Sequence, residues 1–178
     1  MSLGFWKNAS PRRKRIITII ITFIISVIIT AVATLTPIEA QEAKDINNEL
    51  NQTVGSLKEQ NTLLQFIFGN NFMITLIMFV PIIGPLFGVY AFYNTGALIA
   101  AVATAEHFNP TLRFLTLFLI PVTWLEFLAY SIAIAESVWL IRRIIQRRGK
   151  REIINASMFI SICAVILLVA AIIETVLI

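Results

Sequence analysis

Residues 12–35 read RRKRIITIIITFIISVIITAVATL, four basic residues followed by an uncharged run from Ile16 to Leu35. An apolar helix of roughly 20 residues matches the ~30 Å hydrocarbon core of a bilayer. Basic residues beside such a helix mark its cytoplasmic end. The stretch therefore predicts a membrane-spanning helix at 16–35 with the N-terminus inside.

A secretory signal peptide is the alternative for this stretch, because Ile38-Glu39-Ala40 loosely resembles a cleavage site. The apolar core of a signal peptide is about 7–15 residues long, however, and this run is longer. We interpret it as a retained first span.

The composition agrees with a membrane protein. The chain has 178 residues, of which 58% are hydrophobic and 13% charged, which is too apolar for a soluble domain. Most of the basic residues lie in two blocks, before 16–35 and at 142–151, where they set topology and attract anionic lipid. We therefore expect lipid and not nucleic acid as their partner. The basic residues assigned this role are Arg12, Arg13, Lys14, Arg15, Arg142, Arg143, Arg147 and Arg148.

Residues 36–62 form the one sizeable polar stretch, with five acidic residues against two lysines. Thr36-Pro37-Ile38-Glu39 predicts a helix start, because threonine can cap and proline suits the first helical position. We expect a polar helix outside the cytoplasm that packs on the bundle or on a partner. Asn51-Gln52-Thr53 fits a glycosylation acceptor there.

The remaining apolar sequence has to be divided into spans. The uncharged run from Gln60 to Ala105 is about twice a bilayer crossing, and proline and glycine at 81–88 break it. An odd number of crossings has to separate the acidic outer stretch from the basic block at 142–152, which we expect to be a cytoplasmic loop. The prediction is an all-α helical bundle in the cell membrane with five spans, N-terminus inside and C-terminus outside. The later spans are 63–83, 85–105, 113–141 and 154–175.

The fourth of these spans leaves two alternatives open because Pro121 interrupts it. It is either one long helix kinked at Pro121 or a short interfacial helix followed by a span from Val122 to Ile141. We take 113–141 as one kinked span.

Small residues recur at four-residue spacing in the third span, a pattern that lets helix backbones approach closely in lipid. They either pack inside this bundle or contact another protein. The helix-packing residues are Gly84, Gly88, Gly96 and Ala100.

Ionisable residues at membrane depth are the strongest candidates for a site, since a charge in lipid costs on the order of 3 kcal/mol. Glu126, Glu136 and Glu174 lie in predicted spans, and Arg113 lies near the outer side. Arg113 could pair with Glu126 or Glu174 to fix the bundle. A contact with a partner subunit and an ion or proton path are the alternatives.

No set of residues predicts catalysis. The one histidine, His107, has no nucleophile placed with it, and no phosphate-binding glycine pattern occurs. His107 with Glu106 is a weak basis for a metal site, and Cys163 alone permits no intramolecular disulfide. We expect no enzyme activity, no cofactor and no metal.

An ordered set of motifs from Leu63 to Ile178 resembles the stage II sporulation protein M family of five-span membrane proteins. Val122 and Thr123 stand where the family pattern has a histidine and a glycine, so no role of that histidine is carried over. The matching motifs are Asn70-Asn71, Ile82-Ile83-Gly84-Pro85, Tyr93-Asn94-Thr95-Gly96, Pro121 with Glu126, and Ala170-Ala171-Ile172-Ile173-Glu174.

The resemblance implies a non-catalytic membrane scaffold, since the family's namesake is similar to a scaffold that assembles with peptidoglycan-remodelling partners. Our first hypothesis is a scaffold or accessory protein that packs against other membrane subunits, with a second copy also compatible. A narrower one is an accessory subunit of a large membrane enzyme such as archaeal ammonia monooxygenase, on the ground of size, span count and general sequence character. A small transporter or channel is the third.

Overall fold

The computed structural model describes residues 10–146 and 149–178, with the side chains of 149–153 left aside. Within these ranges the chain is helical and contains no strand. Four helices are long and apolar enough to cross a bilayer, namely α2, α5, α7 and the part of α8 from Ile154 to Leu177. The helices are α2 (Pro11–Ala33), α3 (Ala40–Glu59), α4 (Leu63–Phe79), α5 (Ile83–Ala105), α6 (Pro110–Leu117), α7 (Pro121–Ile145) and α8 (Gly149–Leu177). The expectation of a helical membrane bundle is confirmed.

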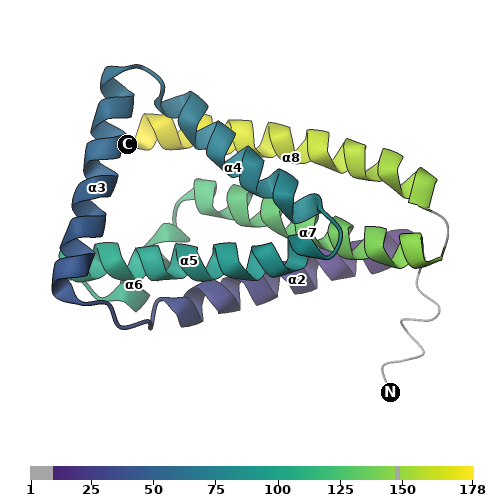
Figure 1. Cartoon of the computed structure of the whole chain (residues 1–178), viewed down its shortest axis with the longest axis horizontal. Coiled ribbons are helices and arrows are strands. Elements are labelled where there is room, and N and C mark those ends of the chain that lie inside the picture. Colours follow the sequence, from purple (N-terminus) through teal and green to yellow (C-terminus); the bar gives the residue numbers. More distant parts are fainter. Residues whose placement is uncertain (1–9, 147–148) are drawn as a thin grey trace.

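The long helices run alongside one another, and α3 lies across one end of them (Figure 1). The start of α2, the end of α7 and the start of α8 lie together at the opposite end, which we call the basic end because Arg12–Arg15, Arg142 and Arg143 lie there. The helix α4 runs obliquely from the α3 end toward the basic end. The polar helix α3 packs against α5 and α4.

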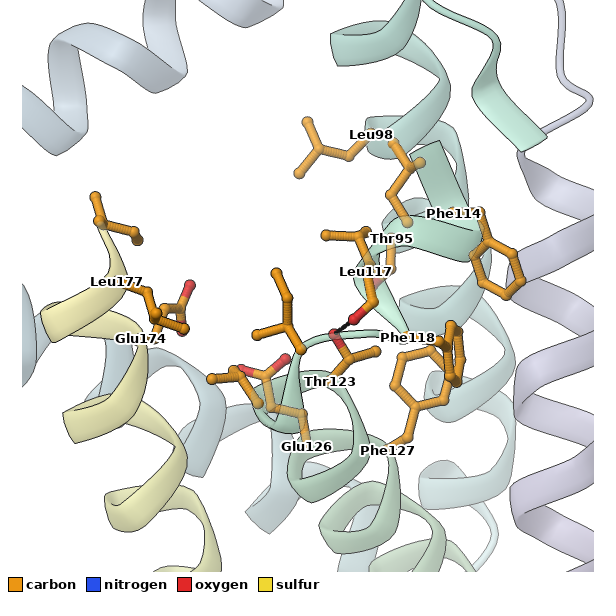
Figure 2. A pocket seen from close by; sticks show the side chains of 14 residues that line it. Thr95, Leu98, Phe114, Leu117, Phe118, Thr123, Glu126, Phe127, Glu174 and Leu177 are labelled. Carbon is orange, nitrogen blue, oxygen red and sulfur yellow. Dashed lines mark hydrogen bonds between the residues drawn. The ribbon is translucent and has the colours of Figure 1, made fainter. Parts of the chain in front are cut away.

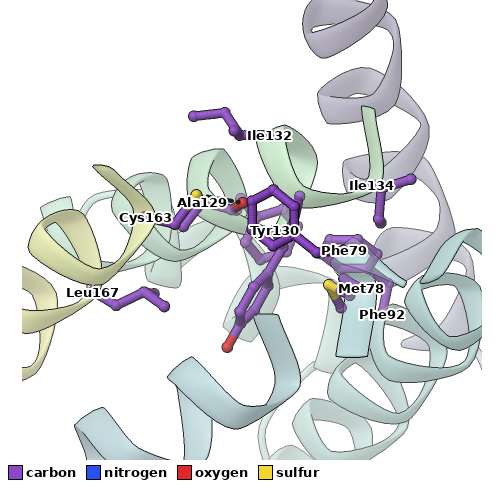
Figure 3. Close-up of a cluster of buried hydrophobic side chains, with 11 residues drawn as sticks. Met78, Phe79, Phe92, Ala129, Tyr130, Ile132, Ile134, Cys163 and Leu167 are labelled. Carbon is purple, nitrogen blue, oxygen red and sulfur yellow. Dashed lines mark hydrogen bonds between the residues drawn. The ribbon is translucent and has the colours of Figure 1, made fainter. Parts of the chain in front are cut away.

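The helix α7 is the centre of the bundle, because α2, α4, α5 and α8 all pack against it. Its residues 129–137 are all buried. Figure 3 shows Tyr130 of α7 among side chains from α4, α5 and α8. Phe92 packs its ring 5.2 Å from that of Phe127 and 6.0 Å from that of Tyr130. A helix buried on every side is typical of the core of a bundle.

Small residues of α5 lie where other helices approach most closely. A methyl group on Gly96 would overlap the backbone of Thr30 and the side chain of Ala33 in α2, and one on Gly88 would overlap Ile134 of α7. Ala100 is also buried. The Thr30 hydroxyl donates to the Phe92 carbonyl oxygen at 3.3 Å. The structure thus places these residues inside the bundle.

The break between α4 and α5 occurs at residues 80–82. Pro81 lies in it, and Ile82 has a φ of 71°, a region that β-branched residues rarely adopt. A methyl group on Gly84 would overlap the Met78 carbonyl oxygen, so the turn requires glycine there. Ser137 of α7 donates its hydroxyl to the Val80 carbonyl oxygen at 2.8 Å, which ties the turn to the central helix.

Three segments differ from the sequence-based expectations. Instead of one helix kinked at Pro121, α6 ends at Leu117 and α7 begins anew at Pro121, because proline suits a first helical position better than an interior one. The helix α3 begins at Ala40 and not at Pro37, with no side-chain cap on Glu39. The Thr36 hydroxyl shares a hydrogen bond of 3.2 Å with Tyr93 instead.

The basic loop expected at 142–152 is shorter than predicted. The helix α7 continues through Arg142 and Arg143 to Ile145, and α8 begins at Gly149. Basic side chains favour the C-terminal turn of a helix, where they oppose the partial negative charge of the helix dipole. Arg147 and Arg148 lie outside the described residues.

The close approach of α2 and α5 predicts that Gly96→Ala destabilises the bundle. Overpacking of a filled interface costs roughly 1–3 kcal/mol, and thermal unfolding of the purified protein in mild detergent measures the loss. Gly69→Ala is the control, because a methyl group there meets nothing within 4 Å. We expect this control to be neutral or slightly stabilising. Equal loss in both variants would contradict the packing described here.

Candidate functional site

A cavity of about 350 Å³ opens near the α3 end of the bundle. Its walls come from the middle of α5, from α6, from the first turns of α7 and from the last turn of α8. Figure 2 shows Glu126 of α7 and Glu174 of α8 on this cavity, with Phe114, Phe118 and Phe127 on the α6 and α7 side. We call it the acidic cavity. Its wall is otherwise mainly apolar.

The two carboxylates of the acidic cavity come from adjacent helices. Glu126 lies in the second turn of α7, and its Oε1 accepts a hydrogen bond from the Asn71 side-chain amide of α4. Glu174 lies one turn before the end of α8. No cationic side chain pairs with either carboxylate among the described residues. The cavity therefore presents two acidic groups to whatever enters it, while Asn71, which is not among its lining residues, holds one of them.

Side chains in the first turn of α7 donate hydrogen bonds to backbone carbonyl groups at the end of α6, which joins the two helices. Thr123 donates its hydroxyl to the Leu117 carbonyl oxygen at 2.8 Å, and Trp124 donates its indole N–H to the Phe118 carbonyl oxygen at 2.8 Å. These bonds serve carbonyl groups that a helix end leaves without partners. Val122 and Thr123, the two positions that depart from the family pattern, both line the acidic cavity.

Arg113 pairs with neither Glu126 nor Glu174, the two partners that the sequence analysis weighed. Its Nη2 lies 3.5 Å from the Glu106 Oε2, and both side chains are about 40% exposed. The reason is that α6 is a separate short helix that packs against α5, which brings Arg113 to the end of α5 and not into the cavity. The acidic cavity thus lacks the cation expected from Arg113.

Glu136 lies away from the acidic cavity, toward the basic end of α7. Its Oε1 lies 2.9 Å from the Arg15 Nε of α2, and its side chain is only 2% exposed. Sequence reasoning missed this partner, as it missed Asn71. Two features could have pointed to the Arg15–Glu136 pair. Arg15 is the last basic residue before the first predicted span, and the basic ends of α2 and α7 lie together.

The arrangement of the two carboxylates suits recognition of a hydrogen-bond donor. No group of three or more metal-ligating side chains occurs within residues 10–146 and 154–178, and His107 is exposed at the end of α5. Two carboxylates beside an apolar surface can accept an ammonium, a guanidinium or an amide while apolar groups fill the remaining space.

Long apolar helices around a buried central helix, with ionisable groups held between helices, define a helical membrane protein. The sequence pattern of the family described as stage II sporulation protein M matches residues 18–177. The chain belongs to that family. The match begins within α2, so it extends beyond the region from Leu63 onward in which the sequence motifs were found.

No curated protein and no solved structure matches the chain. The family assignment therefore rests on the sequence pattern over most of the chain, with the helical structure in agreement.

The hydrogen bond to Glu126 predicts that Asn71→Leu lowers the free energy of unfolding. Loss of one partner of a buried polar group costs about 1–3 kcal/mol, measured by thermal unfolding in mild detergent. The double variant Asn71→Leu/Glu126→Leu should lose less than the sum of the two single variants. Asn70→Leu is the matched control, because Asn70 is exposed and makes no hydrogen bond within the described part of the chain. Additive losses would argue against the contact.

Proposed function

We propose that this protein is a non-catalytic scaffold or accessory subunit of the cell membrane, which binds another membrane protein through the acidic cavity. The observation that carries the proposal is the pair Glu126 and Glu174, which line an open cavity and form no ion pair within the described part of the chain. Carboxylates at membrane depth face protein or water and find partners. A second protein would supply that partner.

The proposed topology has five crossings, with the N-terminus inside and the C-terminus outside. The basic residues of α2 and α7 gather at one end of the bundle and the acidic helix α3 lies at the other, which agrees with the tendency of basic residues to stay in the cytoplasm. With 17 residues, α4 is about 25 Å long. It is the shortest of the five proposed spans.

The expected partner is a membrane helix that carries a basic or amide side chain within an apolar surface. The acidic cavity is walled mostly by leucine, isoleucine and phenylalanine, with Glu126 and Glu174 as its charged groups. Apolar contact would supply most of the buried interface area, and a hydrogen-bonded charge pair would fix the orientation of the partner helix. This complementarity favours a partner protein over a neutral lipid chain.

A second polar group faces outward at mid-length of the bundle. Asn94 lies near the middle of α5 and is exposed, and its side chain makes no hydrogen bond within the described residues. An amide that faces hydrocarbon is unfavourable and usually hydrogen-bonds to a neighbouring helix. This supports an additional contact with another membrane protein.

The topology predicts opposite labelling of two introduced cysteines in a Cys163→Ala background. Asn51→Cys on α3 should react with a membrane-impermeant maleimide in intact cells. Gln146→Cys at the end of α7 should react only after the membrane is permeabilised. Labelling of Gln146→Cys from outside would overturn the orientation.

The partner proposal predicts site-specific cross-linking in native membranes. A photoreactive amino acid at Leu177, which lines the acidic cavity, should capture a distinct protein. Glu126→Gln/Glu174→Gln should reduce the adduct by about tenfold or more, because loss of one partner of a paired interface charge weakens binding by at least that factor.

The same photoreactive group at Val165 is the control, because this residue lies on α8, is 63% exposed and lies outside the acidic cavity. Equal adducts at both positions, or capture of only lipid at Leu177, would contradict a protein partner in the cavity. An adduct with a second copy of this chain would replace the proposed partner with self-association.

A further inference from the structure

A cleft of about 710 Å³ lies at the basic end, far from the acidic cavity along the bundle. Both α2 and α8 pack against α7, and the cleft is lined by one face of each of these three helices. We call it the basic cleft. Its lining comes from the first turns of α2, the last turns of α7 and the early part of α8.

Three guanidinium groups converge on the basic cleft. Arg15 is held in place by Glu136 and stacks its guanidinium 5.8 Å from the Trp139 ring centroid and 5.4 Å from that of Phe159. Arg143 lies 5.9 Å from the Trp139 ring. The described charges that line the cleft are all positive, and the Glu136 that pairs with Arg15 is outside the lining. The cleft therefore attracts an anion.

The lining of the basic cleft also includes a residue with a buried, unsatisfied polar group. Trp139 is 6% exposed, and its indole N–H has no acceptor among the described residues. A buried indole N–H usually finds a partner. Asn155 supplies an amide on the α8 side.

The lining changes from polar to apolar along the bundle. Arg12, Arg143 and Asn155 lie toward the helix ends, whereas Ile16, Ile19, Met158 and Phe159 lie deeper along the same helices. An amphiphile with an anionic head and an apolar tail matches this order. A free phosphate ion would use only the outer part of the cleft.

We propose that the basic cleft binds one anionic phospholipid, with its phosphate among Arg12, Arg15 and Arg143 and an acyl chain along Ile16, Ile19 and Phe159. Guanidinium groups bind phosphate through paired charge-assisted hydrogen bonds. The site differs from general attraction of basic residues to the membrane surface, because it combines three arginines with an apolar lining.

The test is binding of phosphatidylglycerol to the purified full chain in mild detergent, followed by native mass spectrometry. The cleft variant is Arg12→Gln/Arg143→Gln. The control is Arg13→Gln, compared with the single cleft variant Arg12→Gln, because Arg13 is adjacent to Arg12, is also exposed and lies outside the cleft lining. Arg142 is left unchanged, because its guanidinium lies 5.5 Å from the Trp139 ring centroid. We expect the cleft variant to bind roughly tenfold more weakly or worse, and the control to bind within about twofold of the wild type.

Additional binding measurements distinguish a phospholipid from other anions as the ligand of the cleft. Phosphatidylcholine should bind weakly to all variants, and millimolar glycerol phosphate or inorganic phosphate should not displace phosphatidylglycerol. If the double cleft variant does not fold, Arg12→Gln alone replaces it, since Arg12 is exposed. Equal loss in the cleft and control variants would overturn the site, and displacement by free phosphate would overturn its assignment to a lipid.

Discussion

A carboxylate at membrane depth has to be covered by protein and given a partner, and this constraint governs the packing around α7. The central helix carries Glu126 in its second turn and Glu136 just past its midpoint. The helix α2 brings Arg15 to Glu136, and α4 brings Asn71 to Glu126. A carboxylate left in hydrocarbon would cost on the order of 3 kcal/mol, so the polar contacts favour one arrangement of helices whose apolar surfaces alone would pack in many ways. Glu174, which lines the acidic cavity, forms no ion pair among the described residues.

Close packing on α5 makes those polar contacts geometrically accessible. Gly96 lets α2 approach α5, and Gly88 admits Ile134 of α7. In lipid, helices gain no hydrophobic free energy from contact, so close fit and hydrogen bonds have to supply the association. The Thr30 hydroxyl on the Phe92 carbonyl is one such bond. Small residues on α5 and paired carboxylates on α7 therefore act together.

Much of the fold was predictable from charge and hydropathy. Apolar length located four helices that are long enough to cross a bilayer, and basic residues identified the end at which α2 and α7 meet. The predictions were less accurate where two local signals competed. Pro121 permits either a kink or a new helix start, and the hydrogen bonds of Thr123 and Trp124 to α6 favour the second. Pairing of Glu126 with Asn71 and of Arg113 with Glu106 depends on helix rotation, which an apolar sequence with little periodicity does not encode. The acidic residues of the site were found from sequence, but their neighbours were not.

The short length of α4 has a consequence for the surrounding lipid. Four helices of the bundle are long enough to cross a bilayer, whereas α4 has 17 residues and runs obliquely. In the proposed topology the hydrocarbon beside Phe66, Met73 and Leu76, which are exposed on α4, has to thin locally to match it. Such hydrophobic mismatch costs a fraction of a kcal/mol per Å and is relieved by association with other proteins or by thinner membranes. The flank formed by α4 would thus sort this protein toward thinner regions of the bilayer.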